Sequence, residues 1–69
     1  MFSFSNSLID LKDAYARRDA FKVAVAFRAI DGFYLSASAN EQARMDRQLA
    51  EVRSQVSEAD YKAVAAQQS

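Results

Sequence analysis

The side chains that most often carry out catalysis or bind metals are missing from this sequence of 69 residues, which has no His and no Cys. An imidazole base, a thiolate nucleophile, a disulfide and the usual zinc ligands are therefore excluded. The eight Ser residues have no plausible base to activate them. We expect a protein that is not an enzyme and that needs neither a metal nor another cofactor.

The carboxylates offer little more chemistry. Asp10 and Asp13 are three residues apart, so a helix would place both on one face. Such a pair can bind a metal or transfer a proton, but Asp on a helix surface is far more often simply hydrated. Glu58 and Asp60 fit the first turn of a helix, where a carboxylate interacts favourably with the helix dipole.

Arg17, Arg18 and Lys22 form the only local cluster of basic residues. Together with Tyr34 they are our candidates for partner binding, because Arg and Tyr are enriched at protein interfaces. No direct contact with nucleic acid is expected, since nine basic residues balance nine acidic ones and phosphate binding needs a basic surface. The cluster is either a solvated helix face or a contact for an acidic protein surface or a phosphate, and we take the protein contact as the candidate.

The elements that must position these residues are predicted to be helices. The sequence has no Pro, a single Gly and many Ala, Leu, Glu, Gln, Arg and Lys residues, which all favour helix. We expect an all-α protein built as a helical hairpin of two long antiparallel segments, Ser7–Leu35 and Asn40–Ala66. A kink within either segment is compatible with the pattern.

Several boundaries stay open at this level. Ser7 is the expected N-cap of the first segment, which we predict to continue through the polar residues Arg17–Asp19. Gly32 fits either a close approach of two backbones within a helix or a C-cap. Either Ser38 or Asn40 can cap the second segment.

The second segment itself allows two interpretations near Ser57, because it either restarts there or runs through to about Ala66. Residues 1–69 are expected to form one domain. Its ends, residues 1–5 and 67–69, are expected to fray.

Residues 20–35 are unusually apolar, with twelve apolar side chains among sixteen residues. One apolar side contains Phe21, Val25, the stem of Arg28 and Gly32, and a second contains Val23, Phe27, Ile30 and Tyr34. A helix that is apolar on two sides must be covered on two sides. We therefore predict a homodimer with a four-helix arrangement, in which the hairpin core and the dimer seam are formed by Phe21, Val25, Phe27 and Ile30.

The expected location is the cytoplasm of the cell. No stretch approaches the roughly 20 apolar residues that a membrane span requires. The N-terminal residues Met1–Phe4 also lack the basic residues and the long apolar run of a secretory signal. Contact with a membrane is therefore not expected.

The whole chain resembles a small phage-encoded quorum-sensing anti-activator of Pseudomonas. The likeness lies in the overall string, in SNSLIDLKDAYARRDAFKVAVAFRAIDGFYL (residues 5–35) and NEQARMDRQLAEVRSQV (residues 40–56), and no short motif carries it. The resemblance implies a helical homodimer made early in infection. It also implies that the protein binds a host LasR-type transcriptional activator and blocks its DNA binding, with the type IV pilus assembly ATPase as a second target.

A two-helix chain that must dimerise also resembles the Rop-type plasmid RNA-binding bundle in its architecture. The alternative function is therefore a helical dimer that binds nucleic acid. The basic stripe that an RNA-binding face would need is not evident in the sequence, so inhibition of host proteins by direct contact is the function we expect.

Overall fold

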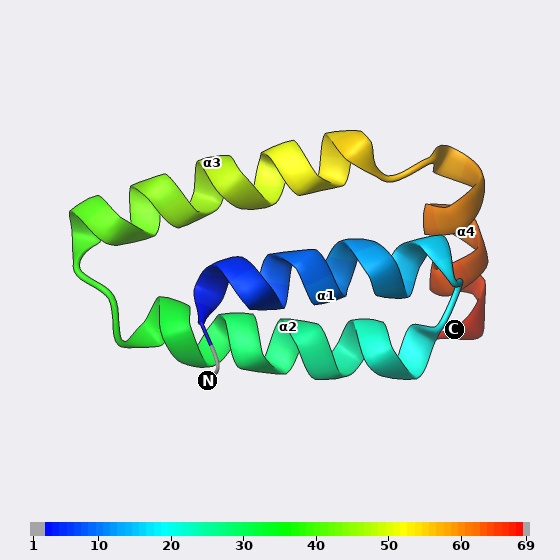
Figure 1. The fold of residues 1–69 in the computed structure, drawn as a ribbon, viewed down its shortest axis with the longest axis horizontal. Coiled ribbons are helices and arrows are strands. Elements are labelled where there is room, and N and C mark those ends of the chain that lie inside the picture. The colour runs from blue at the N-terminus through cyan, green and yellow to red at the C-terminus, as the bar shows by residue number, and fades with distance from the viewer. Residues whose placement is uncertain (1–2, 69) are drawn as a thin grey trace.

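Four α-helices form the molecule in the computed structural model, which describes residues 3–68. They are α1 (Phe4–Ala16), α2 (Ala20–Leu35), α3 (Ala39–Gln55) and α4 (Glu58–Gln67). The predicted all-α class is confirmed. Figure 1 shows α1 lying between α2 and α3, while α4 crosses one end of these three helices.

The first long segment is two helices, and the prediction of continuity through Arg17–Asp19 is wrong. Arg18 has a positive φ of 54°, which a continuing right-handed helix does not allow. The side chain of Asp19 then caps α2 by accepting a hydrogen bond of 3.1 Å from the backbone N–H of Lys22. The chain therefore reverses here, and α2 packs antiparallel to α1 (Figure 1).

The second long segment is also divided, at the Ser57 position that the sequence left open. Val56 has extended backbone and ends α3, and the Ser57 hydroxyl caps α4 by accepting from the N–H of Asp60. At the start of α3 the cap is Ser38 rather than Asn40, in a capping box with Glu41. The expected hairpin of two long helices is thus replaced by four shorter ones.

Helices reach close to both ends of the described chain. Ser3 caps α1 by accepting from the N–H of Asn6, so Ser7 is not the cap and lies buried in the second turn. Residues 4–5 belong to α1, and Gln67 makes two hydrogen bonds through its side chain. Residues 1–2 and 69 of the predicted frayed ends lie outside the described residues.

The core is centred on α1. Its buried side chains Leu8, Leu11, Ala14 and Tyr15 pack against buried residues of the other helices and of the α3–α4 turn, namely Val23, Ala26, Ile30, Val56 and Val64. No residue of α3 is buried. Its Leu49 and Val52 are partly buried against the core.

Of the four residues predicted to form the hairpin core and the dimer seam, one is buried and three are exposed in the single chain. Ile30 is buried, with 1% of its surface exposed, but Phe21 is 78%, Val25 51% and Phe27 38% exposed. The inward face of α2 is instead set by Val23, Ala26 and Ile30. The small side chains of Ala14 and Ala26 at this contact allow α1 and α2 to pack closely there.

Candidate protein-binding surface

A strip of exposed residues, most of them apolar, runs along the outer face of α2. It consists of Phe21, Val25, Arg28, Gly32 and Leu35, and we call it the outer strip. Their spacing of four, three, four and three residues places them on one side of a helix. Phe21 and Leu35 are 78% and 80% exposed, so the strip presents large apolar side chains to solvent at both of its ends.

Gly32 lies within this strip and inside the helix. The helix continues past Gly32 to Leu35, and Ser36 caps it, donating from its hydroxyl to the Gly32 carbonyl, so the C-cap interpretation at Gly32 is wrong. A Cβ added at Gly32 would meet nothing within 4 Å. Within the single chain no close approach of a second backbone explains this glycine, although Gly in a helix interior costs about 1 kcal/mol relative to Ala.

A shallow hollow of about 420 Å³ borders the outer strip where α2 faces α1. Phe21 and Val25 form its apolar wall, and Asp10, Asp13 and Lys22 supply its charges. The two carboxylates are therefore placed beside an apolar surface. Among the described residues, no group of three or more acidic side chains is arranged to hold a metal ion.

The four predicted partner-binding residues are not brought together. Arg17 and Lys22 are exposed near the α1–α2 corner, where Arg17 forms an ion pair of 3.0 Å with Asp13 one turn earlier. Tyr34 is at the other end of α2, about 18 Å away from Lys22 along the helix axis. The four residues therefore do not form a single surface.

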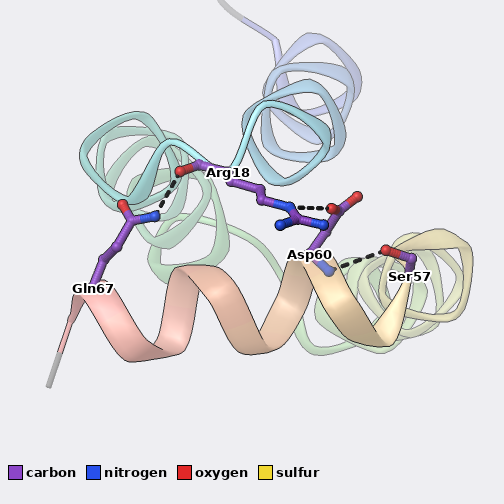
Figure 2. Close-up of polar contacts among 4 residues, drawn as sticks. All are labelled: Arg18, Ser57, Asp60 and Gln67. Carbon is purple, nitrogen blue, oxygen red and sulfur yellow. Dashed lines mark hydrogen bonds and ion pairs between the residues drawn. The ribbon is translucent and has the colours of Figure 1, made fainter.

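Arg18 makes its contacts within the same chain. Figure 2 shows its guanidinium reaching from the α1–α2 corner to Asp60 on α4, with a 2.8 Å distance between Nε and Oδ1. The side-chain amide of Gln67 donates to the Arg18 carbonyl at 2.9 Å and accepts from the N–H of Ala20 at 3.3 Å. This polar clamp of Arg18, Asp60 and Gln67 holds α4 across the corner.

The clamp changes the titration of its carboxylate. The hydrogen bond from Arg18, together with the contact to Ser57, lowers the pKa of Asp60. A lowered pKa means that the folded chain favours the charged form of this carboxylate. The contact is therefore a stabilising one at neutral pH.

Tyr34 is also engaged within the chain. Its hydroxyl donates to Asp46 of α3 at 3.3 Å, and its carbonyl accepts from the side chain of Gln42 at 2.9 Å. Burial and the neighbouring Asp46 carboxylate raise the pKa of Tyr34. This residue joins α2 to α3 at the end of the molecule opposite to the clamp.

The sequence pattern predicted only part of the outer strip. It placed Phe21, Val25, Arg28 and Gly32 on one side of the helix but did not extend that side to Leu35, which is the most exposed large apolar residue in the described chain. The continued spacing of three residues after Gly32 was the available signal. The role of Gln67 had no local signal, because its partners are 47 and 49 residues away.

No helix in the described part of the chain is both long and apolar enough to cross a membrane. No protein-family profile matches the chain, and comparison with curated proteins and with solved structures found no similar protein.

Proposed function

We propose that this protein is a non-enzymatic phage inhibitor that works by direct contact with host proteins in the host cytoplasm. The observation that carries the mechanism is the outer strip, where Phe21, Val25 and Leu35 are half or more exposed on one helix face. It would join two copies into a paired scaffold, and the remaining surface of that scaffold would contact the host protein. A contiguous exposed apolar surface on a small protein marks a site of interaction. Neither a catalytic group nor a cofactor is needed for inhibition by occlusion.

We further propose that the outer strip is the seam of a homodimer. A chain of this size rarely gains enough stability from a single core, and here α3 contributes no buried residue to that core. Pairing through Phe21, Val25 and Leu35 would remove the most exposed of the large apolar side chains of α2 from water. Gly32 in the middle of the strip would let the second copy approach closely.

The identity of the targets comes from the sequence resemblance. The first is a LasR-type transcriptional activator, whose DNA binding the protein blocks, and the second is the type IV pilus assembly ATPase. The exposed residues Arg17 and Lys22 beside the strip are available to such a partner, while Arg18 and Tyr34 hold the chain's own helices together.

A titration of purified LasR-type activator bound to its operator DNA tests this function. We expect the protein to release the DNA at a fixed molar ratio to the activator, because occlusion is stoichiometric and shows no turnover. Retention of the activator–DNA complex at a large molar excess of the protein would contradict the proposal. The same titration against ATP hydrolysis by the pilus ATPase tests the second target.

The alternative is a Rop-like protein that binds nucleic acid itself. The salt dependence of binding distinguishes it from the proposed function. Direct phosphate binding weakens steeply between about 50 and 200 mM salt, whereas a contact with an apolar centre changes much less. We expect no binding of the protein alone to duplex DNA or to an RNA hairpin. Tight binding with a steep salt dependence would favour the alternative.

A further inference from the structure

A second apolar surface lies inside the angle between α2 and α3. The two helices lie on different sides of α1, and α4 closes one end, as Figures 1 and 2 show. Between them is an open hollow of about 480 Å³, which we call the inner groove. Its lining includes Leu11 and Tyr15 of α1, Phe27 of α2, Leu49 and Arg53 of α3, and Tyr61 of α4.

The inner groove retains apolar surface that the chain does not bury. Phe27 and Tyr61 are 38% and 36% exposed, and Leu49 is only partly buried. In a four-helix bundle a fourth helix running alongside the others would cover such side chains. Here α4 crosses the end of the other helices instead (Figure 2), so the space alongside them stays open.

Arg53 is the charged residue in this lining. Its guanidinium carbon lies 3.7 Å from the centre of the Tyr61 ring, which orients the side chain along the wall. Its ion pair with Glu58 is long, at 3.4 Å, and 71% of the Glu58 side chain is exposed. An exposed pair of this kind is weak, so a carboxylate brought in beside Arg53 can replace Glu58.

We infer that the inner groove binds one amphipathic α-helix of a partner protein, with apolar side chains against Phe27 and Leu49 and a carboxylate against Arg53. A helix fits better than an extended peptide, because the walls are helices whose backbone groups are already bonded. An extended peptide would find no backbone partners there. The inference takes from the proposed function only that the protein acts by contact with another protein.

Two matched pairs of variants test the groove. Ala50→Trp places a bulky ring in the inner groove from an exposed lining position, and Ala43→Trp places the same ring on α3 at an exposed position outside it. Arg53→Glu reverses the charge of the lining, and Arg47→Glu reverses an exposed charge of α3 outside it. Circular dichroism confirms that each variant folds, since none removes a buried side chain.

The probe is a synthetic amphipathic peptide of about 20 residues, long enough to form a helix, with a Leu stripe flanked by Glu. A second peptide carries Lys in place of each Glu. We expect Ala50→Trp to weaken binding of the Glu peptide about tenfold relative to Ala43→Trp, as loss of an interface centre does. Arg53→Glu should weaken the Glu peptide and strengthen the Lys peptide, while Arg47→Glu should do neither.

Equal binding by the Ala50→Trp and Ala43→Trp variants would overturn the inference, as would peptides that bind alike whatever the charge at position 53. If Ala50→Trp instead dissociates a dimer in sedimentation, a second copy covers the groove and the inference is also wrong. Release of DNA by the activator separates the two proposals. Peptide binding without DNA release contradicts the proposed function alone, and DNA release by a protein that binds neither peptide contradicts the groove alone.

Discussion

At the scale of single residues, Arg18 stabilises the fold through both its backbone and its side chain. Its left-handed backbone conformation costs about 1–2 kcal/mol for a residue other than Gly. That conformation is held by Gln67, whose amide spans the carbonyl of Arg18 and the N–H of Ala20. Because Asp60 binds the guanidinium of the same residue, the α1–α2 corner and α4 stabilise each other.

The clamp predicts a pH dependence of stability. The pKa of Asp60 is lowered in the folded chain by the hydrogen bond from Arg18, so this carboxylate binds its proton more readily after unfolding. Its contribution is therefore complete above its unfolded pKa of about 3.9 and is lost as the pH falls through the lower folded value. Asp60→Asn should lower the thermal unfolding midpoint at pH 7, and the difference from the parent should shrink below pH 4.

Asp13→Asn is the matched control for this experiment. Asp13 also pairs with an arginine, but both side chains of that pair are more than half exposed, and an exposed pair adds little stability. Asp13→Asn should therefore leave the midpoint nearly unchanged at every pH. A difference between Asp60→Asn and the parent that stays constant from pH 7 to pH 2.5 would show that the charge of Asp60 is not what matters.

At the scale of elements, α2 has two kinds of apolar face and only one is covered in the single chain. Val23, Ala26 and Ile30 pack against α1, while Phe21, Val25 and Leu35 are exposed on the opposite side. The helix therefore has an outer face whose composition its own fold does not explain.

Gly32→Ala separates helix stability from association. The substitution meets no steric obstacle in the single chain, so it should stabilise α2 by about 1 kcal/mol. For a chain of this size that corresponds to a rise of about 4–8 °C in the unfolding midpoint of the monomer. If a second copy approaches closely at Gly32, the same methyl group should weaken the dimer.

Unfolding of dilute protein and sedimentation of concentrated protein measure these two effects separately. Val25→Ala serves as the comparison, because it removes apolar side-chain atoms from the same strip without adding volume next to the glycine. A Gly32→Ala variant that is stabilised and dimerises as strongly as the parent would place the close approach elsewhere.

At the scale of the whole molecule, α3 is attached without a buried side chain of its own, whereas α4 contributes the buried Val64. The buried core lies mainly between α1 and α2, and α3 is joined to it through half-buried side chains and the contact of Asp46 with Tyr34. A fold of this kind gains from any partner that covers the remaining apolar surface, because a ligand that binds only the folded state stabilises it.

The dimer proposal is tested at this scale by Phe21→Gln. Since Phe21 is 78% exposed, its replacement should change the folding stability of the monomer by no more than about 0.5 kcal/mol. The same change should convert the dimer to a monomer in sedimentation equilibrium, because it removes the largest apolar side chain of the seam. Ile9→Gln, at an exposed position of α1 that is 65% accessible, should leave the dimer intact.

Two results would contradict this proposal. One is a parent protein that sediments as a folded monomer at micromolar concentration. The other is a Phe21→Gln variant that remains dimeric. The second result would move the seam away from the outer strip without affecting the description of the single chain.

By itself the sequence determined the helical class and the absence of any site that needs His or Cys. It also named the caps at Ser38 and Ser57, each as one of two alternatives. These features depend on residue types and on neighbours within one turn, so local physics is enough to predict them. The break at Arg18 was missed because no local residue forbids a helix there. The hydrogen bonds of its backbone carbonyl and side chain come from residues 42 and 49 positions away.

Only the tertiary structure decided which face of α2 is buried. Both sides contain apolar residues in the sequence, although one of them includes Arg28 and Gly32, and the side with Val23, Ala26 and Ile30 joins the core formed with α1. That choice leaves Phe21 and Leu35 in solvent and makes the outer strip a candidate surface. Periodicity states how many apolar sides a helix has, but the contacts between helices distant in sequence determine which side remains exposed.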